Sequence, residues 1–175
     1  LGHQGVLQLE RAETAAVCPT SAELEAVPPL PEIVEIQDES LLRDFITEAL
    51  EYIGEIEVNI LNLEKNPTDK EYINAIFRPF HSIKGVASFL NLDHIRDLAH
   101  NLENLLDKAR NNELAVTPPL IDVVLDGADT LNTMIGQLRD KTDGKVQEIY
   151  KLDISSLVER IKSVGKGEPV AGKAQ

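Results

Sequence analysis

Apolar side chains recur every three or four residues along most of the chain after Asp38. The first run of this kind predicts one long amphipathic helix, because that spacing places side chains on a single helical face. The sequence "KNP" at residues 65–67 ends this helix. The apolar seam that we expect to face the core consists of Leu42, Ile46, Ala49, Ile53, Ile56, Ile60 and Leu63.

Two further helices follow with the same spacing. Thr68 stands three residues before Glu71 and forms a capping box that begins the second helix. The sequence "NLD" at 91–93 ends it, and Asp93 can cap a third helix, which ends near "RNNE" at 110–113. Their seams are Ile73, Ile76, Phe80, Ile83, Ala87 and Leu90 in the second helix, and Ile95, Leu98, Leu102, Leu105 and Ala109 in the third.

A fourth helix opens at Thr117, with two prolines in its first turn, and "KTDGK" at 141–145 ends it. Its seam is Ile121, Val124, Ala128, Leu131, Ile135 and Leu138. A fifth, shorter helix is predicted from Asp153 to about Ser163. Four helices with such seams and short connections predict an all-α fold, an up-down-up-down four-helix bundle with an additional C-terminal helix.

The same pattern divides the chain into four regions. Residues 1–37, which four prolines interrupt, form a linker or N-terminal tail with a short helix near 7–16. Residues 38–142 form the bundle, residues 143–164 carry the fifth helix packed on it, and residues 165–175 form a flexible C-terminal linker.

Composition and charge narrow the classes of function. The formal net charge of the 175 residues is -13, which disfavours binding to nucleic acid or to an anionic membrane. A lone cysteine, Cys18, cannot form an internal disulfide and indicates a reducing compartment, so we expect a cytoplasmic protein. The N-terminal stretch lacks the basic start and apolar run of a signal peptide, and it begins with Leu, which suggests a fragment of a longer protein.

Polar side chains lie beside the apolar seams of the second and third helices. On the second helix, His81 and Lys84 point the same way, about 100° from the seam. On the third helix, His100 and Glu103 are one turn apart. If these helices pack as an antiparallel hairpin, two polar stripes face each other across one groove. The stripes are Phe77, His81, Lys84 and Ser88 on one helix, and Arg96, His100, Glu103 and Asp107 on the other.

Such a groove would have a definite chemistry. If Glu103 accepts the Nδ1 proton of His81, the lone pair of the imidazole is fixed on Nε2, toward solvent. The carboxylate also stabilises the cation that forms when Nε2 attacks an electrophile. Lys84 can neutralise an incoming phosphoryl group. Gly85 weakens the helix by about 0.5–1 kcal/mol but leaves space, either for a partner protein or for a neighbouring helix of the bundle.

The stretches "FRPFHSIKG" and "LAHNLENLLDKARNNEL" resemble the histidine phosphotransfer domain of chemotaxis histidine kinases of the CheA family. The resemblance covers roughly residues 38–141. It implies that His81 is the phospho-acceptor, that Glu103 holds its Nδ1, that Lys84 and His100 complete a polar network, and that Gly85 allows close approach of a partner.

The resemblance also implies the partners. The ATP-binding domain of the parent kinase would phosphorylate the histidine with ATP and Mg²⁺, and the phosphoryl group would pass to an aspartate of a response regulator. We expect neither a cofactor nor independent catalysis in this fragment, and no direct contact with nucleic acid or a membrane. The sequence does not choose between chemotaxis and another motility or developmental output.

Two departures and two alternatives accompany this interpretation. Val86 stands where a second small residue is common in the family, and Pro79 inside the helix removes an N–H bond and should bend the helix before the histidine. The first alternative is a helical interaction module without chemistry. The second is a metal site at His81, His100 and Glu103, which the absence of a second Glu-x-x-His motif disfavours.

Overall fold

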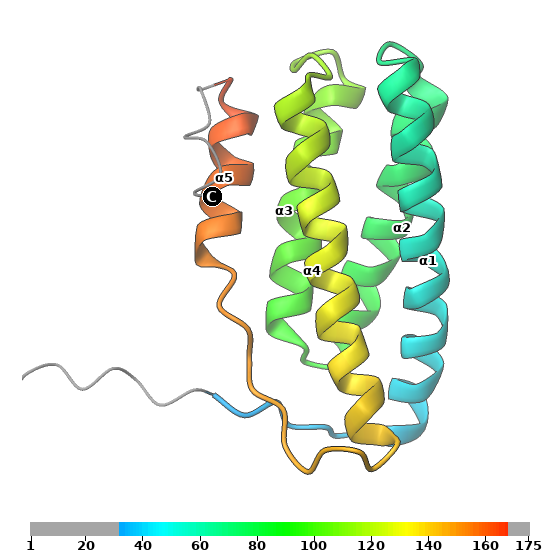
Figure 1. The fold of residues 1–175 in the computed structure, drawn as a ribbon, viewed down its shortest axis with the longest axis vertical. Coiled ribbons are helices and arrows are strands. Elements are labelled where there is room, and N and C mark those ends of the chain that lie inside the picture. The colour runs from blue at the N-terminus through cyan, green and yellow to red at the C-terminus, as the bar shows by residue number, and fades with distance from the viewer. Residues whose placement is uncertain (1–31, 168–175) are drawn as a thin grey trace, which may run out of the picture. The chain divides into compact units, whose positions relative to one another are not determined.

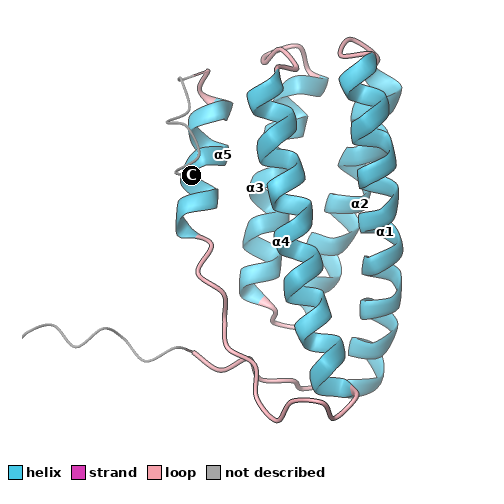
Figure 2. Cartoon of the chain, viewed as in Figure 1, coloured by secondary structure: helices cyan, strands magenta, loops and turns pink. Residues whose placement is uncertain are grey.

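The computed structural model of the protein describes residues 32–167, and within them the chain forms five α-helices and no β-strand (Figures 1 and 2). They are α1 (Glu39–Lys65), α2 (Lys70–Phe89), α3 (Asp93–Arg110), α4 (Pro118–Thr142) and α5 (Ser155–Gly165). Cys18 and the helix predicted near 7–16 lie outside the described residues. No helix in the described part of the chain is both long enough and apolar enough to cross a membrane.

The helices α1 to α4 form the predicted up-down-up-down bundle (Figure 1). Every residue of the four predicted seams is buried, and together these side chains form one continuous core. Phe80, the only aromatic residue of the seams, is completely buried in α2. The bundle is therefore held mainly by aliphatic packing, as the spacing of the apolar residues predicted.

Two helix starts differ from the prediction. Asp69, not Thr68, caps α2, because its carboxylate accepts a hydrogen bond of 2.9 Å from the backbone N–H of Glu71. Asp93 is the first residue of α3 rather than its cap, and its carboxylate accepts a hydrogen bond from the side chain of Arg96. Thr117 does cap α4, although its side chain makes no capping hydrogen bond. These changes shift the helix starts by a residue and leave the core faces as predicted.

The helix α2 continues through Pro79. The proline ring is buried against the core, although proline cannot donate the backbone hydrogen bond that a helix interior normally makes. Packing of the α2 core face therefore holds this turn helical, and the histidine that follows two residues later stays on a helix.

A close helix contact elsewhere in the bundle depends on Gly127 of α4. A Cβ atom at this position would lie 2.5 Å from Cδ1 and 2.8 Å from Cδ2 of the completely buried Leu102 of α3. The glycine thus allows α3 and α4 to pack closely at the level of Leu102.

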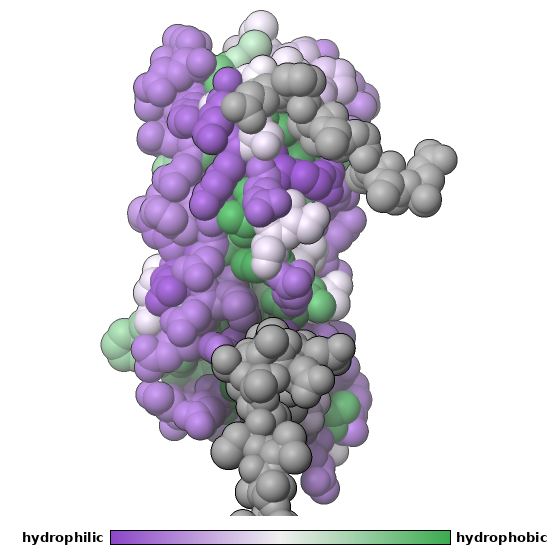
Figure 3. All heavy atoms as spheres, turned by 90° about the vertical axis from the view of Figure 1, so that its left-hand side faces the viewer, coloured by the Kyte–Doolittle hydropathy of each residue, from purple (hydrophilic) through white to green (hydrophobic). Residues whose placement is uncertain are grey.

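The fifth helix packs where the sequence predicted it, on the bundle. The helix begins at Ser155, two residues later than the predicted start at Asp153. Residues 143–154 before it form a non-helical connection that runs back along the bundle (Figure 2). Ile161 and Val164 of α5 are buried, and Arg160 forms an ion pair of 2.9 Å with Asp126 of α4. Figure 3 shows the α5 side of the molecule, where hydrophilic residues cover most of the surface.

Residues 32–37, predicted to be part of a tail, lie against this connection. Ile33 and Tyr150 form an isolated antiparallel β-bridge, in which the N–H of Val34 donates to the carbonyl of Ile149 (3.0 Å) and the N–H of Lys151 donates to that of Glu32 (2.8 Å). The side chains of Lys151 and Glu32 also form an ion pair of 2.6 Å. We call residues 32–37 the N-terminal strap.

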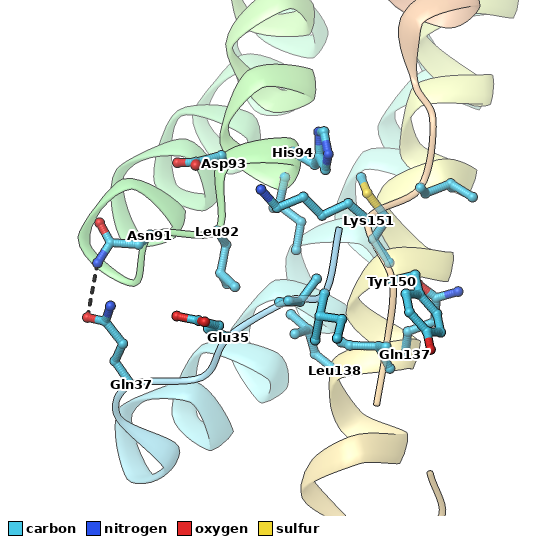
Figure 4. A pocket seen from close by; sticks show the side chains of 16 residues that line it. Glu35, Gln37, Asn91, Leu92, Asp93, His94, Gln137, Leu138, Tyr150 and Lys151 are labelled. Carbon is cyan, nitrogen blue, oxygen red and sulfur yellow. Dashed lines mark hydrogen bonds between the residues drawn. The ribbon is translucent and has the colours of Figure 1, made fainter. Parts of the chain in front are cut away.

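A cavity of about 220 Å³ lies where the strap meets the bundle (Figure 4). It is bounded by the strap, the α2–α3 turn, the end of α4 and residues 149–152. The side chain of Asn91 donates a hydrogen bond of 3.1 Å to that of Gln37 across its rim. None of the site residues predicted from the sequence lines this cavity.

Candidate functional site

The site predicted from the sequence forms between α2 and α3. The antiparallel packing of these helices brings His81 and Lys84 of α2 against Glu103 of α3. The three side chains differ in exposure: 63% of the His81 side chain is accessible to solvent, against 24% for Lys84 and 12% for Glu103. The imidazole therefore lies at the surface, and the carboxylate lies beneath it.

Glu103 contacts both side chains of α2. Its Oε1 lies 3.3 Å from Nδ1 of His81 and accepts a hydrogen bond of 2.9 Å from Nζ of Lys84. Its Oε2 lies 2.8 Å from the same Nζ as an ion pair, but it is buried and accepts no hydrogen bond. A carboxylate at Nδ1 favours the tautomer with the proton on Nδ1, so the lone pair of His81 lies on Nε2. This is the orientation that the sequence predicted.

The charge of Glu103 is maintained by these contacts. Burial raises the pKa of the carboxyl group, but the hydrogen bonds and charges of Lys84 and His81 outweigh it, so the pKa lies below its ordinary value of 4.5. Glu103 is therefore ionised at neutral pH and can stabilise positive charge on the imidazole. The structure thus gives Lys84 a contact that the sequence did not reveal, since its ammonium group is held by Glu103.

Phe77 stacks on the imidazole of His81, and Arg110 packs in turn on the Phe77 ring. The Phe77 ring stacks on His81 with a centroid separation of 6.0 Å and an interplanar angle of 14°. The guanidinium carbon of Arg110 lies 4.1 Å from the centroid of the Phe77 ring, and Arg110 also pairs with Asp107. Sequence analysis had missed Arg110. Its spacing of seven residues from Glu103 places both on one face of α3, which is the signal that could have found it.

Gly85 is exposed beside His81, and a Cβ atom added to it would meet no atom within 4 Å. This glycine therefore does not allow two helices of the bundle to approach, which was one of the two interpretations of the sequence. In the described structure that role belongs to Gly127. The space beside Gly85 is open to solvent and to a partner.

His100 does not join the network of Glu103. Its side chain is exposed, and its Nε2 lies 3.3 Å from the amide nitrogen of Asn104 on the same helix. Within the described residues, no hydrogen bond or ion pair joins His100 to His81 or Glu103. The helical rotation that directs Glu103 toward α2 directs His100 toward the cleft between α3 and α5, which it lines.

The arrangement of side chains at this site suits a histidine nucleophile better than a metal ion. Among the described residues, no group of three or more His, Cys, Asp and Glu side chains is placed to hold a metal ion. What the residues do provide is an exposed imidazole, a half-buried carboxylate that contacts its Nδ1, a cation that holds the carboxylate, and open space beside them at Gly85.

The comparisons with known proteins agree with this geometry. The sequence matches the Hpt domain family over residues 40–141, and the chain therefore belongs to that family. The predicted resemblance to the phosphotransfer domains of CheA-type chemotaxis kinases is confirmed by two relatives. The sensor histidine kinase CheAY of Helicobacter pylori is 39% identical over 115 residues, which are 63% of this chain and 14% of that protein. The CheA phosphotransferase domain from Thermotoga maritima is 38% identical, with a TM-score of 0.57, over 59% of this chain and 98% of that domain.

A third protein has the same fold at lower identity. It is the phosphorylated P1 domain of CheA3 from R. sphaeroides, solved in complex with CheY6, with 17% identity and a TM-score of 0.62 over 74% of this chain and 98% of that one. The chain thus spans nearly all of these solved domains but only about one seventh of the H. pylori kinase.

Proposed function

We propose that this protein is a phosphoryl carrier, in which His81 accepts a phosphoryl group from the ATP-binding domain of a chemotaxis-type kinase and passes it to an aspartate of a response regulator. The single observation that carries the proposal is the contact of 3.3 Å between Nδ1 of His81 and the half-buried Glu103, which leaves Nε2 free at the surface. Membership of the Hpt family and the likeness to CheA domains support it.

The first step is an attack of the Nε2 lone pair on the γ-phosphorus of ATP. The N–P bond forms, the bond from phosphorus to the bridging oxygen breaks, and ADP leaves with that electron pair. The imidazole becomes cationic, with its proton still on Nδ1, and the Glu103 carboxylate stabilises this charge. The partner domain supplies ATP and Mg²⁺, which neutralises the phosphates.

The second step reverses the chemistry at nitrogen. An aspartate oxygen of the response regulator attacks phosphorus, the N–P bond breaks, and its electron pair returns to Nε2. The product is an acyl phosphate on the regulator and a neutral imidazole that keeps its Nδ1 proton. The P1 domain of CheA3 in complex with CheY6 supports this choice of partner, because that domain has the same fold.

Lys84 has two roles in this proposal. In the described structure it holds Glu103 and so helps to fix the position of the carboxylate. When the phosphoryl group is present, its ammonium group is one turn away from His81 and can neutralise part of the new charge. His100, which lies apart from the network, has no step in the proposed chemistry.

The experiment that tests the proposal is phosphorylation of the chain with an active kinase core of the chemotaxis type and labelled ATP. We expect an acid-labile, base-stable label that is lost in His81→Gln and retained in His94→Gln, a matched control at the start of α3. No label on the wild-type chain, with a cognate kinase that phosphorylates another substrate, would favour the alternative of a helical interaction module.

A further inference from the structure

The solvent face of α2 next to His81 carries a second feature that the phosphorylation site does not use. Phe89, the last residue of α2, is 75% exposed, more than any other large hydrophobic residue in the described structure. Single exposed apolar side chains are common on protein surfaces, but an exposed aromatic ring offers a partner a large apolar area, and Phe89 lies one turn from the open backbone at Gly85.

Helical geometry places Phe89 on the same side of the molecule as His81. The two residues are eight positions apart, which corresponds to about 12 Å along the helix axis and about 80° around it. Gly85 lies between them, about 40° from His81, and its missing side chain leaves the backbone open. A partner that reaches Nε2 of His81 over Gly85 therefore meets the Phe89 ring next.

Arg78 extends this surface in the other direction. It lies three residues before His81 and about 60° around the helix, on the same side as Gly85 and Phe89. It is exposed, and within the described part of the chain no carboxylate forms an ion pair with it. Lys84, by contrast, is held by Glu103. We call Arg78, Gly85 and Phe89 the recognition strip.

We propose that the recognition strip is the docking surface for the response regulator, and that Phe89 is the apolar anchor that determines the affinity for it. This inference rests on the proposed function. Charge complementarity favours this occupant: the acceptor that must come to His81 is a carboxylate, and Arg78 is the cation beside His81 that is not already paired.

The test compares the two transfer steps in one variant, Phe89→Ser, in the full chain. The first assay measures phosphorylation of the chain by the kinase core, and the second measures transfer from the phosphorylated chain to a CheY-type receiver protein that accepts the group from the wild type. We expect the receiver KM to rise about tenfold or more, with the maximal rate unchanged, because loss of a central aromatic anchor weakens binding by at least that factor. Phosphorylation by the kinase core stays at the wild-type rate.

Two control variants make the result specific. Val58→Ser changes a comparable residue, 60% exposed on α1, and leaves both steps unchanged. Phe89→Leu keeps an apolar anchor and retains most of the affinity for the receiver. An unchanged receiver KM in Phe89→Ser, or an equal rise in the KM of both partners, would overturn the proposal.

Arg78→Gln tests the charged end of the strip. If Arg78 meets acidic groups of the receiver, the variant has a slower transfer at low salt and a weaker dependence on ionic strength than the wild type. An unchanged salt dependence would remove Arg78 from the strip.

Failure of the proposed function gives a different result. In that case neither the kinase core nor phosphoramidate, a small phosphoryl donor that needs no docking surface, labels His81 in the wild-type chain. A label on His81 with unchanged receiver transfer in Phe89→Ser would leave the carrier function intact and refute only the role of the strip.

Discussion

At the scale of single residues, the site depends on one carboxylate shared by two donors. Oε1 of Glu103 faces Nδ1 of His81 and Nζ of Lys84, and Oε2 lies against the same ammonium group. The lysine therefore limits the rotation of the carboxylate, and the carboxylate limits that of the imidazole. Under the proposed function, this arrangement fixes the direction of the Nε2 lone pair before any partner arrives.

Replacement of Glu103 tests this orienting role. We expect Glu103→Gln to slow phosphorylation of His81 by the kinase core by about 10- to 100-fold, by analogy with the loss of a carboxylate that orients a metal-bound histidine. The circular dichroism spectrum should stay that of a folded bundle, because Glu103 lies beside the core rather than within it. Glu113→Gln, at an exposed position after α3, serves as the control. Wild-type phosphorylation of the Glu103 variant would contradict the role.

The pKa of Glu103 leads to a second prediction, on stability. Because the pKa in the folded protein lies below the ordinary value of 4.5, the unfolded chain binds a proton more readily, and folding stability rises with pH in this range. The contribution of Glu103 is fully present above pH 4.5 and is lost as the pH falls through the pKa of the folded state.

Thermal unfolding of the wild type and Glu103→Gln between pH 7 and pH 3 measures this contribution. We expect the wild type to have the higher melting temperature at neutral pH and the difference to shrink as the solution becomes acidic. A difference that is constant over the whole range would show that the ionised carboxylate does not contribute to stability.

At the scale of helices, two glycines have opposite surroundings. Gly127 faces the completely buried Leu102, and Gly85 faces open space. Both lie inside helices, where alanine is intrinsically favoured over glycine by about 0.5–1 kcal/mol. The neighbours of each glycine therefore decide the sign of a substitution.

We expect Gly85→Ala to stabilise the bundle by about 0.5–1 kcal/mol, because its methyl group meets no atom. Gly127→Ala should instead destabilise it, because overpacking of a dense core costs about 1–3 kcal/mol and exceeds the gain in helix propensity. Urea unfolding of the two variants measures both free energies. Stabilisation by Gly127→Ala would show that Leu102 moves away at little cost.

The core faces of the helices could be predicted from the sequence, but one of the helix caps could not. The apolar spacing identified all four core seams and the helix pair that holds His81 and Glu103, because periodicity determines which residues share a helical face. It could not decide between Thr68 and Asp69 as the cap of α2. Both are good capping residues, and the observed hydrogen bond to Glu71 selects the second.

Contacts between side chains of different helices were harder to predict. The distance between Lys84 and Glu103 depends on the rotation of two helices and on the rotamers of two long side chains, and the sequence records neither. The same is true of the packing of Arg110 on Phe77. His100 is a similar case, because its side-chain rotamer decides whether it faces Asn104 on its own helix or another neighbour.

At the scale of the whole described molecule, the N-terminal strap and the connection before α5 place non-helical chain at the end of the bundle where α4 finishes (Figure 1). The bridge between Ile33 and Tyr150 joins two short segments that are far apart in the sequence and have no repeating pattern. Periodicity contains no information about such a pairing, so the strap was assigned to a tail. The fifth helix, predicted from Asp153 to about Ser163, runs from Ser155 to Gly165, and its buried residues Ile161 and Val164 have helical spacing.

The position of His81 on one open face of the bundle has a consequence for the order of events. Under the proposed function, kinase and response regulator must each reach the same Nε2 atom, beside the same open stretch of α2 at Gly85. Two proteins cannot occupy that volume together, so the kinase domain and the response regulator must bind in turn. Every phosphotransfer cycle therefore includes the dissociation of both. The number of phosphotransfer cycles per unit time would then be limited by the dissociation rates of the two partners. Tighter binding of either partner would lower that number rather than raise it.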